Sequence, residues 1–170
     1  MHPEFYLSVN ISMRQFKGGF GKAVLSEILA ETDYPAKHLA LEITESLLID
    51  DDSRTREALD DFRQMGVRLA VDDFGTGYSA LSYLRKFPVN ILKIDRSFIH
   101  DIAENMGDRR LVEAIIAMSH GLDLVVVAEG VETSEQESLL RDLRCDMVQG
   151  YFYSKPIEAN EIKQLIKRSL

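Results

Sequence analysis

The chain has 170 residues, which suits one domain, and 45% apolar and 28% charged residues, as in an ordinary globular protein. Its 20 basic and 28 acidic residues give a net charge of −8, which disfavours binding to nucleic-acid polymers. The longest apolar run, Leu122 to Ala128, is interrupted by Asp123 and is too short to span a membrane. The single cysteine, Cys145, excludes an intramolecular disulfide, and the first residues lack a signal-peptide pattern, so we expect a cytoplasmic location.

Short apolar segments alternate with longer segments of helical periodicity, a pattern typical of βα units around a parallel sheet. A complete (β/α)₈ barrel needs eight strands and typically about 250 residues. Six units therefore indicate either an open doubly wound α/β sheet or a barrel that lacks two units at its start. The predicted strands are residues 5–11, 39–44, 67–72, 89–94, 124–129 and 147–152, and the predicted helices are residues 20–31, 53–65, 79–86, 109–120, 134–143 and 158–168.

Two of these helices carry specific local signals. Ser134 and Glu137 have the spacing of a capping box, which predicts the start of the helix over residues 134–143. In the last helix, Ile162, Leu165 and Ile166 have helical spacing, so we expect them to face the protein interior.

Polar residues interrupt the predicted strands at or near their carboxyl ends. Parallel strands bring these ends to one face of a sheet, so we expect the side chains to converge although they are far apart in the sequence. Carboxylates gathered in this way repel one another unless a cation or shared protons neutralise them. The residues are Asn10, Glu42, Asp72, Asp73, Lys93, Asp95, Glu129 and Gln149.

The ligand types favour a hard divalent cation. Asn10, Glu42, Asp72 and Asp73 offer only oxygen atoms, which suit Mg²⁺ or Mn²⁺ better than zinc or copper. Lys93 can serve as a counter-ion for these acids, or it can orient a nucleophilic water, and the two roles are compatible. The residues alone thus predict a metal-dependent barrel or α/β enzyme that acts on a phosphate or carboxylate ester.

Together these residues resemble the EAL-domain family of cyclic di-GMP phosphodiesterases. The resemblance covers nearly the whole chain and implies a TIM-like (β/α)₈ barrel, of which about six βα units are present. The matching stretches are Ser8-Val9-Asn10-Ile11-Ser12, Leu41-Glu42-Ile43-Thr44-Glu45, Asp72-Asp73-Phe74-Gly75-Thr76-Gly77-Tyr78-Ser79, Leu92-Lys93-Ile94-Asp95, Val127-Ala128-Glu129-Gly130-Val131-Glu132-Thr133 and Gln149-Gly150-Tyr151-Phe152.

The resemblance also implies a role for each site residue. A first divalent ion would be bound by Asn10, Glu42 and Asp72, and a second by Asp72 and Asp73. Lys93 would contact the nucleophilic water, Glu129 would act as a base or a ligand of the second ion, and the product would be linear pGpG. The remaining roles are fixation of the Asp73–Ser79 loop by Glu45, support of the site by Glu132, and substrate binding by Gln149 near a guanine and by Asp95.

The family's Glu-Ala-Leu strand motif has no counterpart at the expected place. Glu57-Ala58-Leu59 has the right letters, but it lies within the predicted helix over residues 53–65 and after Glu42. We therefore expect residues 1–170 to form the C-terminal three-quarters of an EAL domain, without its first two βα units, and to be inactive or impaired in activity. Open sheet edges favour a homodimer, and family members often dimerise through the region here near residues 79–85.

Three functions follow from these observations. The first is a Mg²⁺- or Mn²⁺-dependent cyclic di-GMP phosphodiesterase, with a sensory or diguanylate-cyclase domain upstream in the parent protein. The second is a non-catalytic cyclic di-GMP receptor or interaction scaffold. The third is a barrel enzyme of the enolase type, in which a lysine base works beside carboxylate-bound Mg²⁺; the paired aspartates and the glycine-rich loop fit it poorly.

Overall fold

A parallel sheet of six strands, in the order β1-β2-β3-β4-β5-β6, organises the part of the chain that the structure describes. The computed structural model describes residues 5–49, 53–75, 84–162 and 164–165. The strands are β1 (Leu7–Asn10), β2 (Leu39–Thr44), β3 (Arg68–Phe74), β4 (Ile91–Ile94), β5 (Val125–Glu129) and β6 (Met147–Gln149). The helices are α1 (Met13–Lys17), α2 (Lys22–Thr32), η1 (Ala36–His38), α3 (Glu45–Ile49), α4 (Ser53–Gln64), α6 (Arg96–His100), α7 (Met106–His120) and α8 (Ser134–Asp142).

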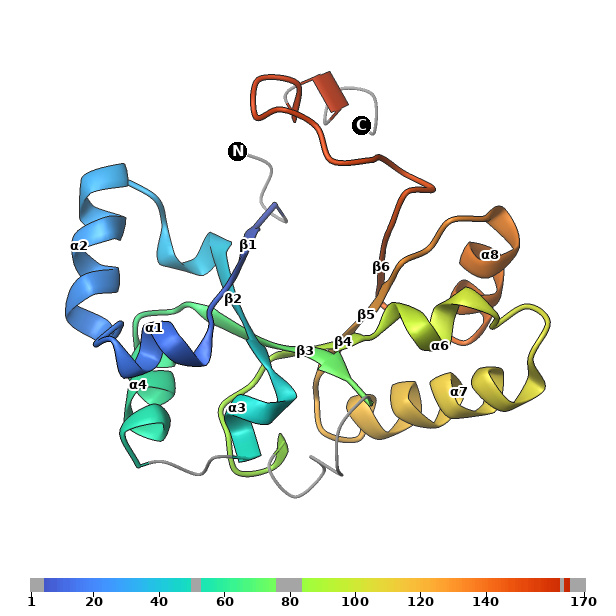
Figure 1. Cartoon of the computed structure of the whole chain (residues 1–170), viewed down its shortest axis with the longest axis horizontal. Coiled ribbons are helices and arrows are strands. Elements are labelled where there is room, and N and C mark those ends of the chain that lie inside the picture. The colour runs from blue at the N-terminus through green and yellow to red at the C-terminus, as the bar shows by residue number, and fades with distance from the viewer. Residues whose placement is uncertain (1–4, 50–52, 76–83, 163, 166–170) are drawn as a thin grey trace.

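The sheet is curled, and the helices lie on its outer side (Figure 1). A doubly wound sheet has helices on both faces, so this alternative is excluded, and the prediction of an incomplete TIM-like barrel is confirmed. Strands β1 and β6 form the two edges of the sheet and diverge on either side of the opening in Figure 1. Leu7 and Val9 of β1 are 47% and 39% exposed at one of these edges.

The central strands are apolar on both faces because each face is covered. Alternate residues point outward and pack against the helices in the main core, as Leu41 and Ile43 of β2 do. The residues between them point into the curl, where a small second core forms. This inner layer consists of Ala40, Ala70, Ile91 and Val127, with Tyr6 and Met147 packed against it.

Helix α4 supplies the largest fully buried side chain of the outer core. Phe62 is fully buried, and its ring lies 6.2 Å from that of Phe16 and 5.8 Å from that of Phe20. Leu59 of the same helix is also fully buried. The Glu57-Ala58-Leu59 sequence is therefore part of an amphipathic helix, as predicted, and does not form a strand.

The structure changes several predicted boundaries. The strand predicted over residues 147–152 ends at Gln149, because the chain turns at Gly150. Gly150 lies so close to the Val131 backbone that a Cβ on it would be 2.0 Å from the Val131 carbonyl oxygen. The capping box of α8 uses Thr133 and Gln136, one residue earlier than predicted. The helix predicted from residue 109 starts at Met106, after the N-cap Asn105.

Two predicted helices lie partly outside the described residues. Most of the helix over residues 79–86, including the region near residues 79–85 expected at a dimer contact, is outside them. The prediction for the last helix was wrong in one respect, because Ile162 and Leu165 are each 36% exposed instead of facing inward. Within the described ranges, no helix has the length and apolarity needed to cross a membrane.

Candidate metal and catalytic site

The polar residues of the site lie two positions beyond the inner apolar layer on four adjacent strands. Since side chains alternate along a strand, a residue two positions after an inward-facing residue also faces inward. This rule places four side chains in one layer of the curl: Glu42 follows Ala40 in β2, Asp72 follows Ala70 in β3, Lys93 follows Ile91 in β4, and Glu129 follows Val127 in β5.

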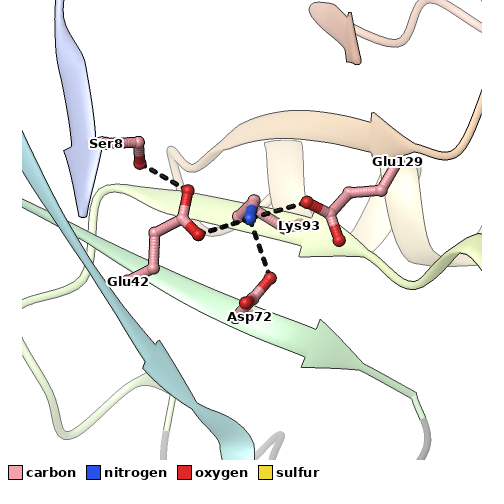
Figure 2. Close-up of polar contacts among 5 residues, drawn as sticks. All are labelled: Ser8, Glu42, Asp72, Lys93 and Glu129. Carbon is pink, nitrogen blue, oxygen red and sulfur yellow. Dashed lines mark hydrogen bonds and ion pairs between the residues drawn. The ribbon is translucent and has the colours of Figure 1, made fainter. Parts of the chain in front are cut away.

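Lys93 lies at the centre of this layer. Its Nζ atom is 2.7 Å from Glu42 Oε2, 2.9 Å from Asp72 Oδ1 and 2.6 Å from Glu129 Oε1 (Figure 2). Burial disfavours the ammonium, but the hydrogen bonds to Glu129, Glu42 and Asp72 outweigh it and hold the pKa of Lys93 above its ordinary value. The predicted convergence of acids from distant segments is therefore present in the fold.

A bulge in β3 explains how two consecutive aspartates can serve one site. Successive residues of a regular strand point to opposite faces, yet the carboxylates of Asp72, Asp73 and Glu129 bring oxygen atoms within 4.8 Å of one another. The register between β3 and β4 shifts between Val71 and Phe74, and Asp73 has the left-handed φ of 54°. The extra residue turns the Asp73 carboxylate towards the side of Asp72.

Groups from α3 and α6 surround this bulge. The buried Glu45, the first residue of α3, accepts a hydrogen bond of 3.3 Å from the Gly75 backbone N–H. Asp95 caps α6 by accepting from the Ser97 backbone N–H at 2.9 Å. Desolvation, the negative charge of Asp72 and then Asp95 raise the pKa of Asp73 above its ordinary value. The proximity of the Asp72, Asp73 and Asp95 carboxyl groups favours a cation beside the bulge.

The other predicted residues have different positions. Asn10 ends β1, is exposed, and lies opposite Glu42 in the register. Gln149 ends β6 and lines an inner cavity of about 220 Å³ together with Glu42 and Lys93. Glu132 is exposed and lines a separate cavity beside α8, with His100 and Gln136.

Two residues near the site were missed by the sequence analysis. The Ser8 hydroxyl donates a hydrogen bond of 2.5 Å to Glu42 Oε1. It lies two positions before Asn10, so strand periodicity could have identified it. The Phe98 ring of α6 packs against Gly75, a contact for which the sequence carries no local signal.

Gly75→Ala is expected to destabilise the fold by about 1–3 kcal/mol, because its φ of +100° is strained for alanine and a Cβ would lie 2.8 Å from the Phe98 ring. Gly66→Ala is the matched control, since Gly66 has a φ of +86° but no atom within 4 Å of the place that a Cβ would take. Thermal unfolding should show a larger loss for Gly75→Ala. Equal losses would mean that the Phe98 contact does not constrain the chain after the bulge.

The donor set suits a hard divalent cation. Asp72, Asp73 and Glu129 offer carboxylate oxygens close together, and Glu42 adds another carboxylate in the same layer. Burial raises the pKa of Glu129 above its ordinary value, while the ion pair with Lys93 opposes this effect. Among the described residues, the grouping contains no cysteine or histidine, which argues against a zinc-type site.

Comparison with known proteins gives consistent results. The sequence profile described as "EAL domain" matches residues 1–156. The cyclic di-GMP phosphodiesterase NbdA of Pseudomonas aeruginosa is 45% identical over 139 residues, which cover 82% of this chain and 18% of NbdA. The bifunctional diguanylate cyclase/cyclic di-GMP phosphodiesterase MucR of the same organism is 40% identical over 162 residues, which cover 95% of this chain and 24% of MucR. The chain thus spans about a fifth of the length of these relatives.

Solved structures agree with the sequence matches. The MucR phosphodiesterase in complex with cyclic di-GMP superposes with a TM-score of 0.88 at 38% identity, covering 95% of this chain and 65% of that one. The manganese and cyclic di-GMP complex of Klebsiella pneumoniae BlrP1 has a TM-score of 0.81 at 31% identity, covering 89% of this chain and 39% of that one. Sequence and fold lead to the same conclusion: the chain belongs to the EAL domain family.

Proposed function

We propose that residues 1–170 form the main part of a metal-dependent phosphodiesterase domain. In the parent protein, this domain hydrolyses cyclic di-GMP to linear pGpG. The observation that carries the proposal is the cluster of Glu42, Asp72 and Glu129 around Lys93, next to an open cavity inside the curled sheet. The cyclic di-GMP complexes of the related MucR and BlrP1 structures support this substrate.

In the proposed reaction, side chains of this domain bind the metal ions, orient the attacking water and transfer protons. Asn10, Glu42, Asp72 and Asp73 would hold two divalent ions, which would supply an activated water and stabilise the phosphodiester oxygens. Lys93 orients the attacking water, and Glu129 accepts its proton. The new bond joins the water oxygen to phosphorus, and the bond to the ribose 3′ oxygen breaks, with a proton returning to that oxygen.

Four further residues are assigned supporting roles. Glu45 fixes the backbone at Gly75, as its hydrogen bond to the Gly75 N–H suggests; residues 76–79 of the predicted Asp73–Ser79 loop lie outside the described residues. Gln149 binds the substrate near a guanine, in keeping with its position on the inner cavity. Asp95, which lies close to Asp73 of the bulge, also binds the substrate. Glu132 supports the site from the segment after β5.

We propose Mg²⁺ or Mn²⁺ as the bound ions, since all the donors are oxygen atoms and the related BlrP1 was solved with manganese. Protons compete with metals for carboxylates. Because burial raises the pKa of Glu129 above 4.5, and burial and Asp72 raise that of Asp73, protonation starts at a higher pH than for ordinary carboxylates. Mn²⁺ titration calorimetry should therefore show affinity falling at a higher pH than for a site of ordinary carboxylates; an affinity that falls only in the ordinary carboxylate range would contradict the assignment.

The direct test is incubation of the full-length protein, and of the 170-residue chain, with cyclic di-GMP and Mn²⁺, followed by chromatography of the products. We expect pGpG from the full-length protein and its loss on chelation of the metal. The open edges of the six-stranded sheet lead us to expect less activity from the isolated chain. Tight binding of cyclic di-GMP without turnover by the full-length protein would favour the receptor function.

We further propose that the chain forms a homodimer, and that the parent protein is cytoplasmic and carries a sensory or diguanylate-cyclase domain. The exposed Leu7 and Val9 at one sheet edge, and Tyr151 and Phe152 after the other, support an association that covers them. The free thiol of Cys145 suits a reducing compartment, and the cyclase activity in the name of MucR supports the domain partner. Light scattering after size-exclusion chromatography should give a dimer mass; a monomer at all concentrations would contradict the dimer.

A further inference from the structure

The ammonium group of Lys93 is fully engaged by carboxylates. An ammonium has three N–H donors, and Lys93 has three carboxylate partners, from Glu42, Asp72 and Glu129, on three different strands (Figure 2). Only 4% of Lys93 is exposed, so water does little to solvate the charge. Lys93 is thus the cation around which this layer of the fold is assembled.

The three carboxylates differ in how much of their binding capacity is already used. Glu42 has both oxygens in hydrogen bonds, Oε1 with the Ser8 hydroxyl and Oε2 with Lys93. Asp72 and Glu129 each direct one oxygen at Lys93, and both belong with Asp73 to the group whose ligand atoms lie within 4.8 Å. A cation can therefore approach Asp72 and Glu129 more easily than it can approach Glu42.

The charges in this layer do not balance. Three carboxylates and one ammonium leave two negative charges in a buried region, where unneutralised charge is costly. We infer that Lys93 is the built-in counter-ion of Glu42 in the metal-free protein and that a divalent cation binds Glu42 only by displacing the Lys93 ammonium from it. The inference rests on the proposed function, because it concerns the metal ions which that function requires.

A lysine that competes with the metal and a lysine that supports metal binding predict opposite changes in metal affinity when Lys93 is replaced. If Lys93 competes with the metal, removing its charge must strengthen metal binding, because a positive charge close to the site repels a cation. If Lys93 only orients the water, its removal raises metal affinity far less, because no Lys93–carboxylate contact has to be broken when the metal binds. If Lys93 organises the ligands for the metal, its removal weakens binding. Metal affinity therefore separates the three roles without any measurement of turnover.

The test compares Lys93→Met with the unmodified chain by Mn²⁺ titration calorimetry and by thermal unfolding in EDTA and in Mn²⁺. Lys93→Met keeps most of the side chain's volume and removes its charge. Lys22→Met is the matched control, because Lys22 forms an exposed ion pair of 3.2 Å with Asp61 and changes the net charge equally. We expect the Mn²⁺ Kd to fall by about tenfold or more in Lys93→Met and to stay the same in Lys22→Met.

Thermal unfolding gives the second readout. In EDTA, loss of the buried counter-ion should lower the Tm of Lys93→Met by roughly 10 °C relative to the unmodified chain. Addition of Mn²⁺ should then raise the Tm of Lys93→Met by more than it raises the Tm of the unmodified chain. If Lys93→Met folds only with Mn²⁺ present, the inference holds, whereas failure to fold at any Mn²⁺ concentration overturns it. An unchanged or higher Kd also overturns it.

The inference and the proposed function fail in different ways. Equal Mn²⁺ affinities of Lys93→Met and the unmodified chain overturn the displacement but leave a metal-dependent phosphodiesterase intact. A full-length protein that binds Mn²⁺ with the expected difference but produces no pGpG contradicts the phosphodiesterase and leaves the displacement intact. Absence of Mn²⁺ binding in every variant contradicts both.

Discussion

Replacement of Glu129 by Gln in the full-length protein is expected to lower the rate of cyclic di-GMP hydrolysis by about 10³-fold. The amide cannot accept the proton of the attacking water. The hydrogen bond of the Glu129 side chain to Lys93 Nζ, now 2.6 Å, can persist through the amide oxygen. The fold should therefore remain, and the rate of pGpG release under saturating Mn²⁺ measures the effect.

Glu113→Gln is the matched control for this prediction. Glu113 is an exposed residue of α7, so the same substitution there changes the net charge equally without touching the cluster. Its hydrolysis rate should equal that of the unmodified protein. A Glu129→Gln protein that keeps more than about a tenth of the activity would rule out Glu129 as the base, given the usual size of general-base contributions.

Phe62→Ala should have the largest effect on stability among simple truncations of the outer core. The side chain is fully buried in α4 and packs against the rings of Phe16 and Phe20, so its removal leaves a cavity between helix and sheet. We expect the free energy of unfolding to fall by about 3–5 kcal/mol. For a chain of this length, the Tm should fall by roughly 10 °C.

Leu111→Ala is the corresponding control, because it truncates an apolar side chain of α7 that is 42% exposed. It should change the free energy of unfolding by less than about 1 kcal/mol, as surface substitutions usually do. Comparable losses in the two variants, measured by denaturant titration, would mean that Phe62 is not a principal contact between α4 and the rest of the core.

Much of the architecture could be predicted from the sequence, because it depends on periodicity. The six strands were found since buried parallel strands are apolar on both faces, and the convergence of Glu42, Asp72, Lys93 and Glu129 followed from their position near the strand ends. The local geometry of the site could not be predicted in this way. The bulge at Asp73 results from pairing with β4 and from the packing of Phe98 on Gly75, which join segments about 20 residues apart.

The short helices and the exposure of the C-terminal segment were also not predicted from the sequence. Helices α1, α3 and α6 have five residues each, too few for a helical hydrophobic period to be visible, and α1 and α6 begin at side-chain caps on Ser12 and Asp95. The exposure of Ile162 and Leu165 depends on which other elements cover that segment, and this is not encoded in its own periodicity.

The most direct test of the account is to locate Mn²⁺ by anomalous diffraction from crystals of the chain grown with the metal. The account predicts anomalous peaks bonded to carboxylate oxygens of Asp72 and Asp73, inside the curl of the sheet and next to Lys93 and Glu129. An ordered crystal in which these carboxylates bind no manganese, while Lys93 alone bridges Glu42, Asp72 and Glu129, would contradict it.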